Sequence, residues 1–504
     1  MTTSEIGILI AIIIYMVAMI AIGAYYSKKN SNTDDFYLGG RKLGPFVTAM
    51  SAEASDMSSW LLMGLPGVAY LTGICDAFWT AVGLAIGTYL NWLIVAKRLR
   101  KYSVVCGDSI TVPDFFANRY RDKKALKCIS ALMIIIFFVP YTASGFAACG
   151  KLFSTLFGMN YMTAMIISAI IIVAYTTLGG FLAASTTDFI QSIVMSIALI
   201  IVVGYGVYSV GGMEQVIANV KDLPGFIDVV STFDATTSKA VSYSPISIVS
   251  TIAWGLGYFG MPHILLRFMA IEDENKIKLS RRIASIWVVI AMAVAIFIGV
   301  MGYAMSAEGV IPNLEDSETI IVQIAHVLST HGLLFAIIAG VILAGILAST
   351  MSTSDSQLLA ASSSVTENLM DGVFGIKLSE KVKVIVARCS VIIIAIIAVF
   401  LASNPNSSVF QIVSFAWAGF GATFGPVMLF ALFWKRSNKY GAISGMAAGG
   451  IMVFVWKFVV RPLGGAWDVY ELLPAFIVAS LFIIVVSLLT KAPEQEIIDE
   501  FESI

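Results

Sequence analysis

An all-α protein that crosses a membrane many times is the fold class that the sequence predicts, and three observations predict it. Of its 504 residues, 58% are hydrophobic and only 12% are charged. Apolar runs long enough to cross roughly 30 Å of hydrocarbon recur along almost the whole chain. The Lys and Arg residues gather in alternate connections between these runs. No soluble domain of this length has an interior that could bury so much apolar surface, so we expect a polytopic membrane protein.

About thirteen apolar runs have the length and composition of transmembrane helices. The first has no basic residue before it, so we expect a retained helix rather than a cleaved signal peptide. In chain order, the expected spans are 6–26, 44–74, 75–96, 128–156, 161–178, 188–210, 243–268, 284–306, 332–365, 387–403, 408–434, 441–460 and 472–490.

The distribution of basic residues predicts the orientation of the chain. Alternate connections hold 25 of the 31 Lys and Arg residues, with nine of them between Lys97 and Lys127. The loops on the other side hold only Lys221, Lys239 and Arg461. Because short basic loops stay on the cytoplasmic side, we expect a plasma-membrane protein with its N-terminus outside and its C-terminus in the cytoplasm.

Several kinds of site have no support in the sequence. The five Cys residues are scattered without a CxxC pair, and the three His residues do not stand in HExxH or HxxxH spacing. The sequence contains no GxxxxGK[ST] loop for ATP. A net charge of −1 favours neither nucleic acid nor acidic partners, and we expect no obligate protein partner. The functional residues should therefore lie among the spans, within the lipid bilayer.

The segment 51–67, SAEASDMSSWLLMGLPG, is unusually polar for the span in which it falls. Asp56 is a candidate site residue, because an ionisable group inside a membrane is costly and usually lines a pathway. The Ser, Gly and Pro residues around it favour a broken helix, whose free carbonyl oxygens suit a small hard cation. The alternative is that the small residues allow close helix packing and that Asp56 anchors a hydrogen bond between helices.

The segment 343–364 is a second polar island and is dense in hydroxyl groups. Ser349, Ser352 and Thr353 stand at i, i+3 and i+4, so one helix face presents a carbonyl oxygen and two hydroxyl oxygens. Ligands that are all oxygen suit an alkali cation and do not suit a transition metal. The alternative is that these hydroxyl groups bond back to the preceding turn of their own helix.

The segment 251–270 is a third unusual span. Its glycines and Pro262 predict an interrupted helix, while Trp254 and Tyr258 stand four apart on one face. Interrupted helices in corresponding halves of a transporter mark its binding site. This span and the span at 44–74 are five apart in order, as an inverted repeat of five plus five spans requires.

Six motifs occur in a characteristic order: ASDMSSWLLMGLPG, FFVPYTASGF, GGFLAASTTDFIQ, AWGLGYFGMPHILLRF, MSTSDSQLL and FAWAGFGATFGPVMLFALFW. Together they resemble the solute:sodium symporter family, most closely its sodium/proline branch, over nearly the whole chain. The resemblance implies a LeuT-type five-plus-five inverted repeat with one extra helix before it and two after it. It divides the chain into an N-terminal helix and loop (1–43), a first repeat (44–210), a second repeat with its preceding outer loop (211–434) and two C-terminal helices with a short tail (435–504).

The resemblance also implies a sodium site between the second and the ninth span. Asp56 would support sodium coupling by holding the broken helix, and Asp188 would do so on the path toward the cytoplasm. A structural salt bridge or a helix cap explains Asp188 as well. The implied sodium ligands are the carbonyl oxygens of Ala54, Met57 and Ser349 and the hydroxyl oxygens of Ser352 and Thr353.

Three positions depart from the family pattern. Glu53 and Ser59 stand where relatives have glycine, and Ser349 stands where they usually have alanine. The extra carboxylate of Glu53 either alters the affinity for the ion or pairs with a neighbouring polar group. Ser349 is harmless if only its carbonyl oxygen binds.

The expected substrate is L-proline, a zwitterion with a flat apolar ring. Its pocket needs aromatic faces for the ring, an acceptor for the ammonium group and a donor for the carboxylate. Aromatic residues in spans also serve as packing or as interfacial anchors. The residues that match the proline branch are Trp60, Tyr141, Trp254, Tyr258 and Pro262.

We therefore expect a sodium-coupled symporter that imports L-proline by alternating access, and not an enzyme. One alternative is a sodium symporter for another small solute, such as pantothenate, a sugar or a different amino acid. A second alternative, from another class, is a channel or a solute sensor with the same fold.

Overall fold

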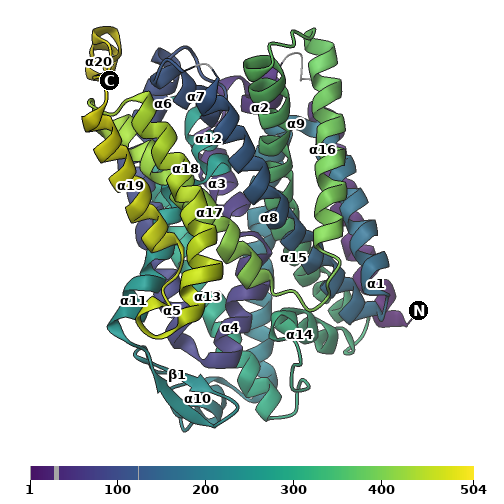
Figure 1. Cartoon of the computed structure of the whole chain (residues 1–504). Helices are drawn as coiled ribbons and strands as arrows, with labels where there is room; N and C mark the ends of the chain where they lie inside the picture. The colour runs from purple at the N-terminus through teal and green to yellow at the C-terminus, as the bar shows by residue number, and fades with distance from the viewer. Residues whose placement is uncertain (1, 28–32, 123) are drawn as a thin grey trace.

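The computed structural model describes residues 2–27, 33–122 and 124–504. Its helices run mostly along one axis and form a bundle, with the C-terminus at one end (Figure 1). The opposite end carries a small antiparallel hairpin of β1 (Ser231–Asp234) and β2 (Lys239–Ser242), with Ser231 opposite Ser242. The short helix α10 lies beside this hairpin, and the N-terminus lies toward the same end (Figure 1).

The helices of the first half of the chain lead from the N-terminus to the hairpin. They are α1 (Thr3–Ser27), α2 (Thr33–Leu38), η1 (Gly39–Arg41), α3 (Pro45–Ser59), η2 (Trp60–Gly64), α4 (Leu65–Thr72), α5 (Ile74–Leu90), η3 (Asn91–Val95), α6 (Ala96–Val105), α7 (Val112–Arg119), α8 (Ala125–Phe157), α9 (Tyr161–Val210) and α10 (Met213–Val220).

The helices after the hairpin complete the bundle. They are α11 (Pro245–Ile252), η4 (Ala253–Gly260), α12 (Pro262–Ala270), η5 (Glu274–Lys276), α13 (Ile277–Ala307), η6 (Ser317–Thr319), α14 (Ile320–Ser329), α15 (Leu333–Ser363), η7 (Ser364–Val373), α16 (Glu380–Leu401), α17 (Val409–Phe433), α18 (Lys439–Val455), η8 (Trp456–Val460), η9 (Arg461–Leu463), η10 (Gly465–Trp467), α19 (Leu472–Leu489) and α20 (Gln495–Glu502).

Both interruptions predicted from the sequence are present. α3 breaks at Ser58, whose backbone has φ 49° and ψ −169°, and the chain continues through η2 into α4. In the second case, η4 ends at Gly260, and α12 starts at Pro262 with a bend of 46°. Pro262 fits the start of α12 because its missing N–H is not needed in the first turn of a helix.

Ten helices among the described residues are long and apolar enough to cross a membrane, or eleven if the bent pair is one span. Two other expected spans fall short of that measure: the broken segment at 44–74 and the shorter apolar helix Tyr161–Thr177. The expected spans 161–178 and 188–210 join in α9, which is bent at Gly180. The count of thirteen and the division into repeats stay predictions.

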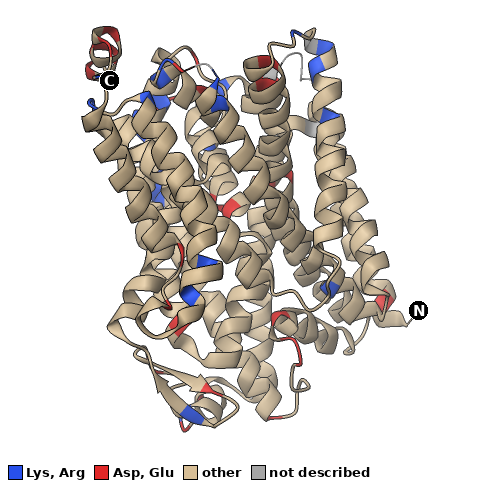
Figure 2. Ribbon diagram, in the orientation of Figure 1, with Lys and Arg blue, Asp and Glu red and all other residues tan. Residues whose placement is uncertain are grey.

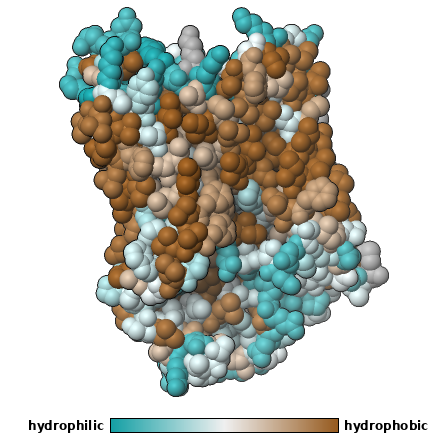
Figure 3. Space-filling view, in the orientation of Figure 1, coloured by the Kyte–Doolittle hydropathy of each residue, from teal (hydrophilic) through white to brown (hydrophobic). Residues whose placement is uncertain are grey.

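On the face shown in Figure 3, an apolar band crosses the middle of the bundle, between two ends that carry more polar residues. Lys and Arg residues gather at the end that bears the C-terminus (Figure 2). Lys28, Lys29 and Lys123, which were counted for the orientation, lie outside the described residues. A chain with this surface is suited to lie in a bilayer with its two ends in water.

The centre of the bundle is built from the polar islands themselves. In α3, every residue from Thr48 to Ser59 is buried, and in α15 burial is continuous from Ile342 to Ser363. α3 packs against α15, α9 and α12, so the islands at 51–67 and 343–364 lie side by side. Polar groups in the centre of a membrane protein, rather than on its lipid face, are the arrangement expected of a transport site.

Candidate functional site

The break in α3 presents backbone oxygens beside α15. A positive φ is uncommon for a residue with a side chain, so the surrounding contacts must hold Ser58 in this conformation. The N–H of Trp60 bonds to the carbonyl oxygen of Met57 and to Ser58 Oγ, which is 3.1 Å away. The turn after the break is thereby closed, while the carbonyl oxygen of Ala54 accepts its hydrogen bond from another helix.

Hydroxyl groups of α15 meet the broken helix at Ala54. Ser352 Oγ donates to the carbonyl oxygen of Ala54 at 2.8 Å and lies 3.2 Å from the carbonyl oxygen of Ser349. Thr353 Oγ1 is also 3.2 Å from the Ser349 carbonyl oxygen. The structure therefore joins four of the five predicted sodium ligands in one hydrogen-bonded group, whereas the Met57 carbonyl oxygen bonds to Trp60.

This group of oxygens is chemically suited to an alkali cation. Hydroxyl oxygens can turn their hydrogen away and offer lone pairs, and carbonyl oxygens offer lone pairs directly. In the described part of the chain, no group of three or more His, Cys, Asp or Glu residues is arranged to hold a metal ion. The bonds within α15 also match the back-bonding that the sequence left as an alternative, but the bond from Ser352 to Ala54 crosses between helices.

An aromatic cavity lies next to the oxygens. Asp56 and Met57 of the broken helix form part of its wall. The remaining wall consists of Trp60, Leu84, Tyr141, Trp254, Val413 and Trp417. The ring centroids of Trp60 and Trp254 are 5.7 Å apart. Phe410 covers both of these rings at 5.9 and 5.5 Å. Three of the five residues predicted for substrate binding, Trp60, Tyr141 and Trp254, thus line one cavity.

Asp56 ties the broken helix to two neighbouring elements. The hydroxyl group of Tyr258, in η4, donates to Asp56 Oδ2 at 2.5 Å, and the hydroxyl group of Tyr141, in α8, donates to the Asp56 carbonyl oxygen at 3.2 Å. Tyr258 therefore contacts the candidate site by its hydrogen bond to Asp56, and it does not line the aromatic cavity. Removal of the Asp56 carboxylate would release a contact between both broken helices.

Comparisons with known proteins show the family to which the chain belongs. A model of the sodium:solute symporter family matches residues 36–449. The sodium/proline symporter of Haemophilus influenzae is 44% identical over 501 residues, which cover 98% of this chain and 97% of that protein. The osmoregulated proline transporter OpuE of Bacillus subtilis is 42% identical over 492 residues, which cover 97% of this chain and 96% of that protein. The chain belongs to the sodium:solute symporter family.

Solved structures support the same fold. A Na+-coupled sialic acid symporter in a substrate-bound outward-open state has a TM-score of 0.80 at 17% identity, covering 97% of this chain and 99% of that one. MhsT in complex with L-phenylalanine has a TM-score of 0.54 at 12% identity, with coverage of 88% and 97%. The symporter therefore has the all-α, LeuT-type fold that the resemblance implied.

Pro262 lies apart from the aromatic cavity of the symporter. It lines a different cavity, together with Phe181, Arg267 and Ser356. Its visible role is to begin α12 after the break, and a direct contact with substrate stays a prediction.

Asp188 lies in an ion pair. Its Oδ2 atom is 3.0 Å from Arg267 Nη2 and accepts a hydrogen bond from Ser51 Oγ at 2.6 Å. Arg267 also donates to Ser51 at 3.0 Å and to Ser356 Oγ at 2.6 Å. Both charged side chains are almost fully buried, at 0% and 1% exposure. This arrangement is the salt bridge that the sequence offered as one explanation of Asp188, and it joins α3, α9, α12 and α15.

Glu53 and Ser59, two of the three positions that depart from the family pattern, are both buried. Glu53 Oε1 accepts hydrogen bonds from Trp92 Nε1 at 3.0 Å and from Thr88 Oγ1 at 3.2 Å. Its other oxygen has no hydrogen-bond partner within the described residues, and neither has the hydroxyl group of Ser59. Glu53 thus pairs with polar neighbours on α5 and η3. Pairing with a polar neighbour was one of the two roles expected for its carboxylate.

Sequence reasoning missed Trp417 as a wall of the cavity. Its Nε1 atom donates to the carbonyl oxygen of Trp254 at 2.7 Å, and its ring meets that of Tyr258 edge to face at 5.1 Å. A Cβ atom on Gly257 would lie 2.0 Å from Trp417 Nε1, so only glycine allows this contact. The glycine-rich run around Gly257 indicates that another group approaches the backbone closely, but it does not indicate which residue does so.

Proposed function

We propose that this symporter imports L-proline together with sodium by alternating access. The observation that carries the proposal is that an oxygen-only group and an aromatic cavity adjoin the same short segment of the broken helix. The residues Asp56 and Met57 belong to the cavity wall, and Ala54, one turn earlier, accepts the hydrogen bond from Ser352. An ion and a solute bound on the two sides of this short segment would act on the same broken helix.

Sodium would bind among the Ala54, Met57, Ser349, Ser352 and Thr353 oxygens. The hydroxyl hydrogens that now point at carbonyl oxygens would turn away, and the cation would take their place between α3 and α15. Binding would therefore replace the hydrogen bond between these helices with shared coordination. The carboxylate of Asp56, on the same segment, would supply negative charge nearby.

Proline would bind at the aromatic cavity beside this group, which holds only about 10 Å³ in this conformation and would have to widen as the helices rearrange during transport. The faces of Trp60, Trp254 and Tyr141 suit its apolar ring. The Nε1 atom of Trp60 is buried and has no hydrogen-bond partner within the described residues, so it is a donor for the proline carboxylate. The names of relatives at 42–44% identity, which are a proline transporter and sodium/proline symporters, favour proline over other solutes.

The membrane potential would drive accumulation, because proline is a zwitterion and sodium carries the net charge. One charge moving through about 100 mV gains about 2.3 kcal/mol, which supports roughly fiftyfold accumulation before the sodium gradient is counted. A transporter of this kind needs no ATP, and membership in the symporter family favours transport over catalysis.

We also propose that the chain lies in the plasma membrane with its N-terminus outside and its C-terminus in the cytoplasm. The Lys and Arg residues gathered near the C-terminus support this orientation (Figure 2). In a variant without the five native Cys residues, cysteines placed one at a time at the exposed positions Val105 and Asp108 of the 102–118 loop should react with impermeant thiol reagents in inside-out vesicles only. Labelling in intact cells would contradict the orientation.

Uptake by the purified protein in liposomes tests the function directly. Labelled proline should accumulate saturably with an inward sodium gradient and should stop accumulating when the gradient is dissipated. A panel of competing solutes, with pantothenate, sugars and other amino acids, tests the choice of solute. Sodium-driven uptake of another solute in place of proline would reject the substrate. Proline flux without accumulation would favour a channel, and binding without flux would favour a sensor.

A further inference from the structure

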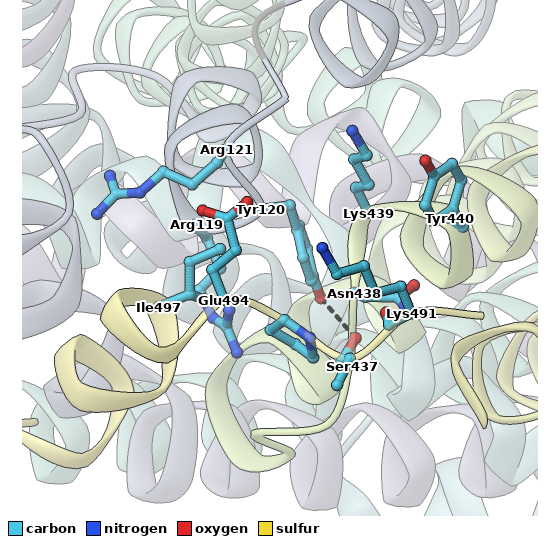
Figure 4. Close-up of a pocket in the computed structure, with 12 residues that line it drawn as sticks. Arg119, Tyr120, Arg121, Ser437, Asn438, Lys439, Tyr440, Lys491, Glu494 and Ile497 are labelled. Atoms are coloured by element: carbon cyan, nitrogen blue, oxygen red, sulfur yellow. Dashed lines mark hydrogen bonds between the residues drawn. The ribbon is translucent and has the colours of Figure 1, made fainter. Parts of the chain in front are cut away.

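A basic cavity of about 250 Å³ lies far from the transport site, at the end of the bundle that bears the C-terminus. Figure 4 shows its wall, which comes from the end of α7, the start of α18 and the segment that joins α19 to α20. Four basic side chains line the cavity, against one acidic residue, Glu494. The basic residues are Arg119, Arg121, Lys439 and Lys491.

Arg119 is the buried member of this group. It is 1% exposed, and its Nε atom donates to the carbonyl oxygen of Ala431 at 3.0 Å. The rings of Tyr102, Tyr120 and Phe501 surround its guanidinium group, with centroids 5.1–5.6 Å from Cζ. The Nη1 and Nη2 atoms have no hydrogen-bond partner in the described part of the chain. Buried donors without an acceptor are costly, so this paired set of N–H groups indicates an anionic ligand.

The lysines around the cavity are also available to an anion. Lys439 and Lys491 form no ion pair in the parts of the chain that the structure describes, whereas Arg121 is bound to Glu500 at 2.6 Å. Lys439 is the first residue of α18, whose N-terminus is capped by Asn438 through the N–H of Gly441. The start of a helix carries a partial positive charge, which adds to that of the side chains.

We propose that this cavity binds a phosphate group, and that the phosphate belongs to the headgroup of an anionic phospholipid. A fork of N–H groups with two lysines that form no ion pair within the described residues suits the oxygens of a phosphate. The neighbouring surface favours a lipid as its source, because Leu488 and Leu489 at the end of α19 are 58% and 81% exposed, just before Lys491. Basic pockets between helices at the membrane surface are a common way to hold such headgroups.

The test titrates the purified full chain, in a neutral detergent, with short-chain phosphatidylglycerol and follows the midpoint of thermal unfolding. Short-chain phosphatidylcholine and inorganic phosphate, at matched ionic strength, are the parallel arms. Phosphatidylglycerol should raise the midpoint most, and Lys439→Gln/Lys491→Gln should weaken its apparent affinity about ten- to thirtyfold. The matched control, Lys377→Gln/Lys381→Gln, removes two charges outside the cavity that, like those of Lys439 and Lys491, form no ion pair in the described residues, and it should keep the affinity.

Arg119→Lys adds a second variant that retains the charge and loses the fork. It should weaken binding of phosphatidylglycerol, and mass spectrometry of the folded protein should find less of this lipid retained. If inorganic phosphate protects as well as the lipid and competes with it, the phosphate site is supported and the lipid source is rejected. If the control pair loses as much affinity as the cavity pair, or if neither pair changes it, the proposal is overturned.

Discussion

Two regions of the symporter bury carboxylates in different ways. Asp188 faces Arg267, so its negative charge is offset by a fixed cation. Glu53 and Asp56 receive hydrogen bonds only from neutral donors, among them Tyr258 and Trp92, and neither forms an ion pair within the described residues. A buried charge is stable only with a partner. Arg267 supplies a fixed partner in the first region, although Asp188 Oδ1 has no hydrogen-bond partner within the described residues. The second region has no fixed cation among the described residues and is suited to a mobile one.

This difference assigns distinct roles to the two regions. The pair of Asp188 and Arg267 joins four helices through Ser51 and Ser356, and we expect it to hold one arrangement of the bundle. The carboxylates of α3 lie beside the oxygens proposed for sodium, and we expect them to act on ion affinity.

Arg267→Met should give the largest loss of stability. It leaves Asp188 buried without a counter-charge, which costs about 3–5 kcal/mol in the free energy of unfolding. The double variant Arg267→Met/Asp188→Leu should recover part of this loss, because no charge is then left unpaired. Thermal unfolding in detergent measures both. If the double variant is no more stable than Arg267→Met, the ion pair does not hold the four helices in one arrangement as we infer.

Asp56→Asn should chiefly raise the sodium requirement of transport. A carboxylate within about 8 Å of a cation, at an effective dielectric constant near 20, contributes about 2 kcal/mol, so the half-maximal sodium concentration should rise about ten- to thirtyfold. Asp188→Leu/Arg267→Met is the control, since it removes a buried carboxylate without leaving a charge unpaired. An equal rise of the sodium requirement in this double variant would favour a place for Asp188 on the sodium path.

Substitutions of Tyr258 and Trp254 should change the sodium and proline dependence of uptake in different ways, although both residues are aromatic. Tyr258→Phe removes the hydrogen bond to Asp56, a kind of bond worth about 1.5–3 kcal/mol, so both the sodium requirement and the KM for proline should rise. Trp254→Phe changes only an aromatic wall, and the KM for proline should rise a few-fold at unchanged sodium dependence. Sodium titrations of uptake at several proline concentrations separate these outcomes. A shift of the sodium requirement in Trp254→Phe would contradict the division.

Ser59→Ala should have the smallest effect. The hydroxyl group of Ser59 is buried and has no hydrogen-bond partner within the described residues, so its removal breaks no visible contact. Sodium and proline dependence should both stay within about twofold of the wild type in the same uptake assay. A large change would mean that this hydroxyl group contacts the ion or the solute in another conformation.

Local chemistry in the sequence was enough to predict which segments form the candidate site. Polar residues inside apolar runs marked the segments 51–67 and 343–364, and the structure brings them together at Ala54 and Ser352. Gly and Pro patterns predicted the breaks at Ser58 and before Pro262. Such features are readable because a membrane makes each buried polar group or free backbone oxygen costly.

The partners of these residues could not be predicted, because they lie far apart in the chain. Asp56 and Tyr258 are separated by 202 positions, and Asp188 and Arg267 by 79. Trp417 joins the cavity only through the packing of α17 on η4, which no local pattern reveals. Helix periodicity defines which face a residue occupies, but the neighbour of that face depends on tertiary packing.

The sodium dependence of Thr353→Ala tests the central claim most directly, with Thr353→Ser as the control that retains the hydroxyl oxygen. Loss of one ligand should raise the half-maximal sodium concentration about ten- to a hundredfold. Because coupling between bound ligands is reciprocal, proline affinity should weaken at low sodium and recover as sodium is raised, while Thr353→Ser should stay near the wild type. A loss of transport in Thr353→Ala that is the same at every sodium concentration would contradict a sodium site between α3 and α15.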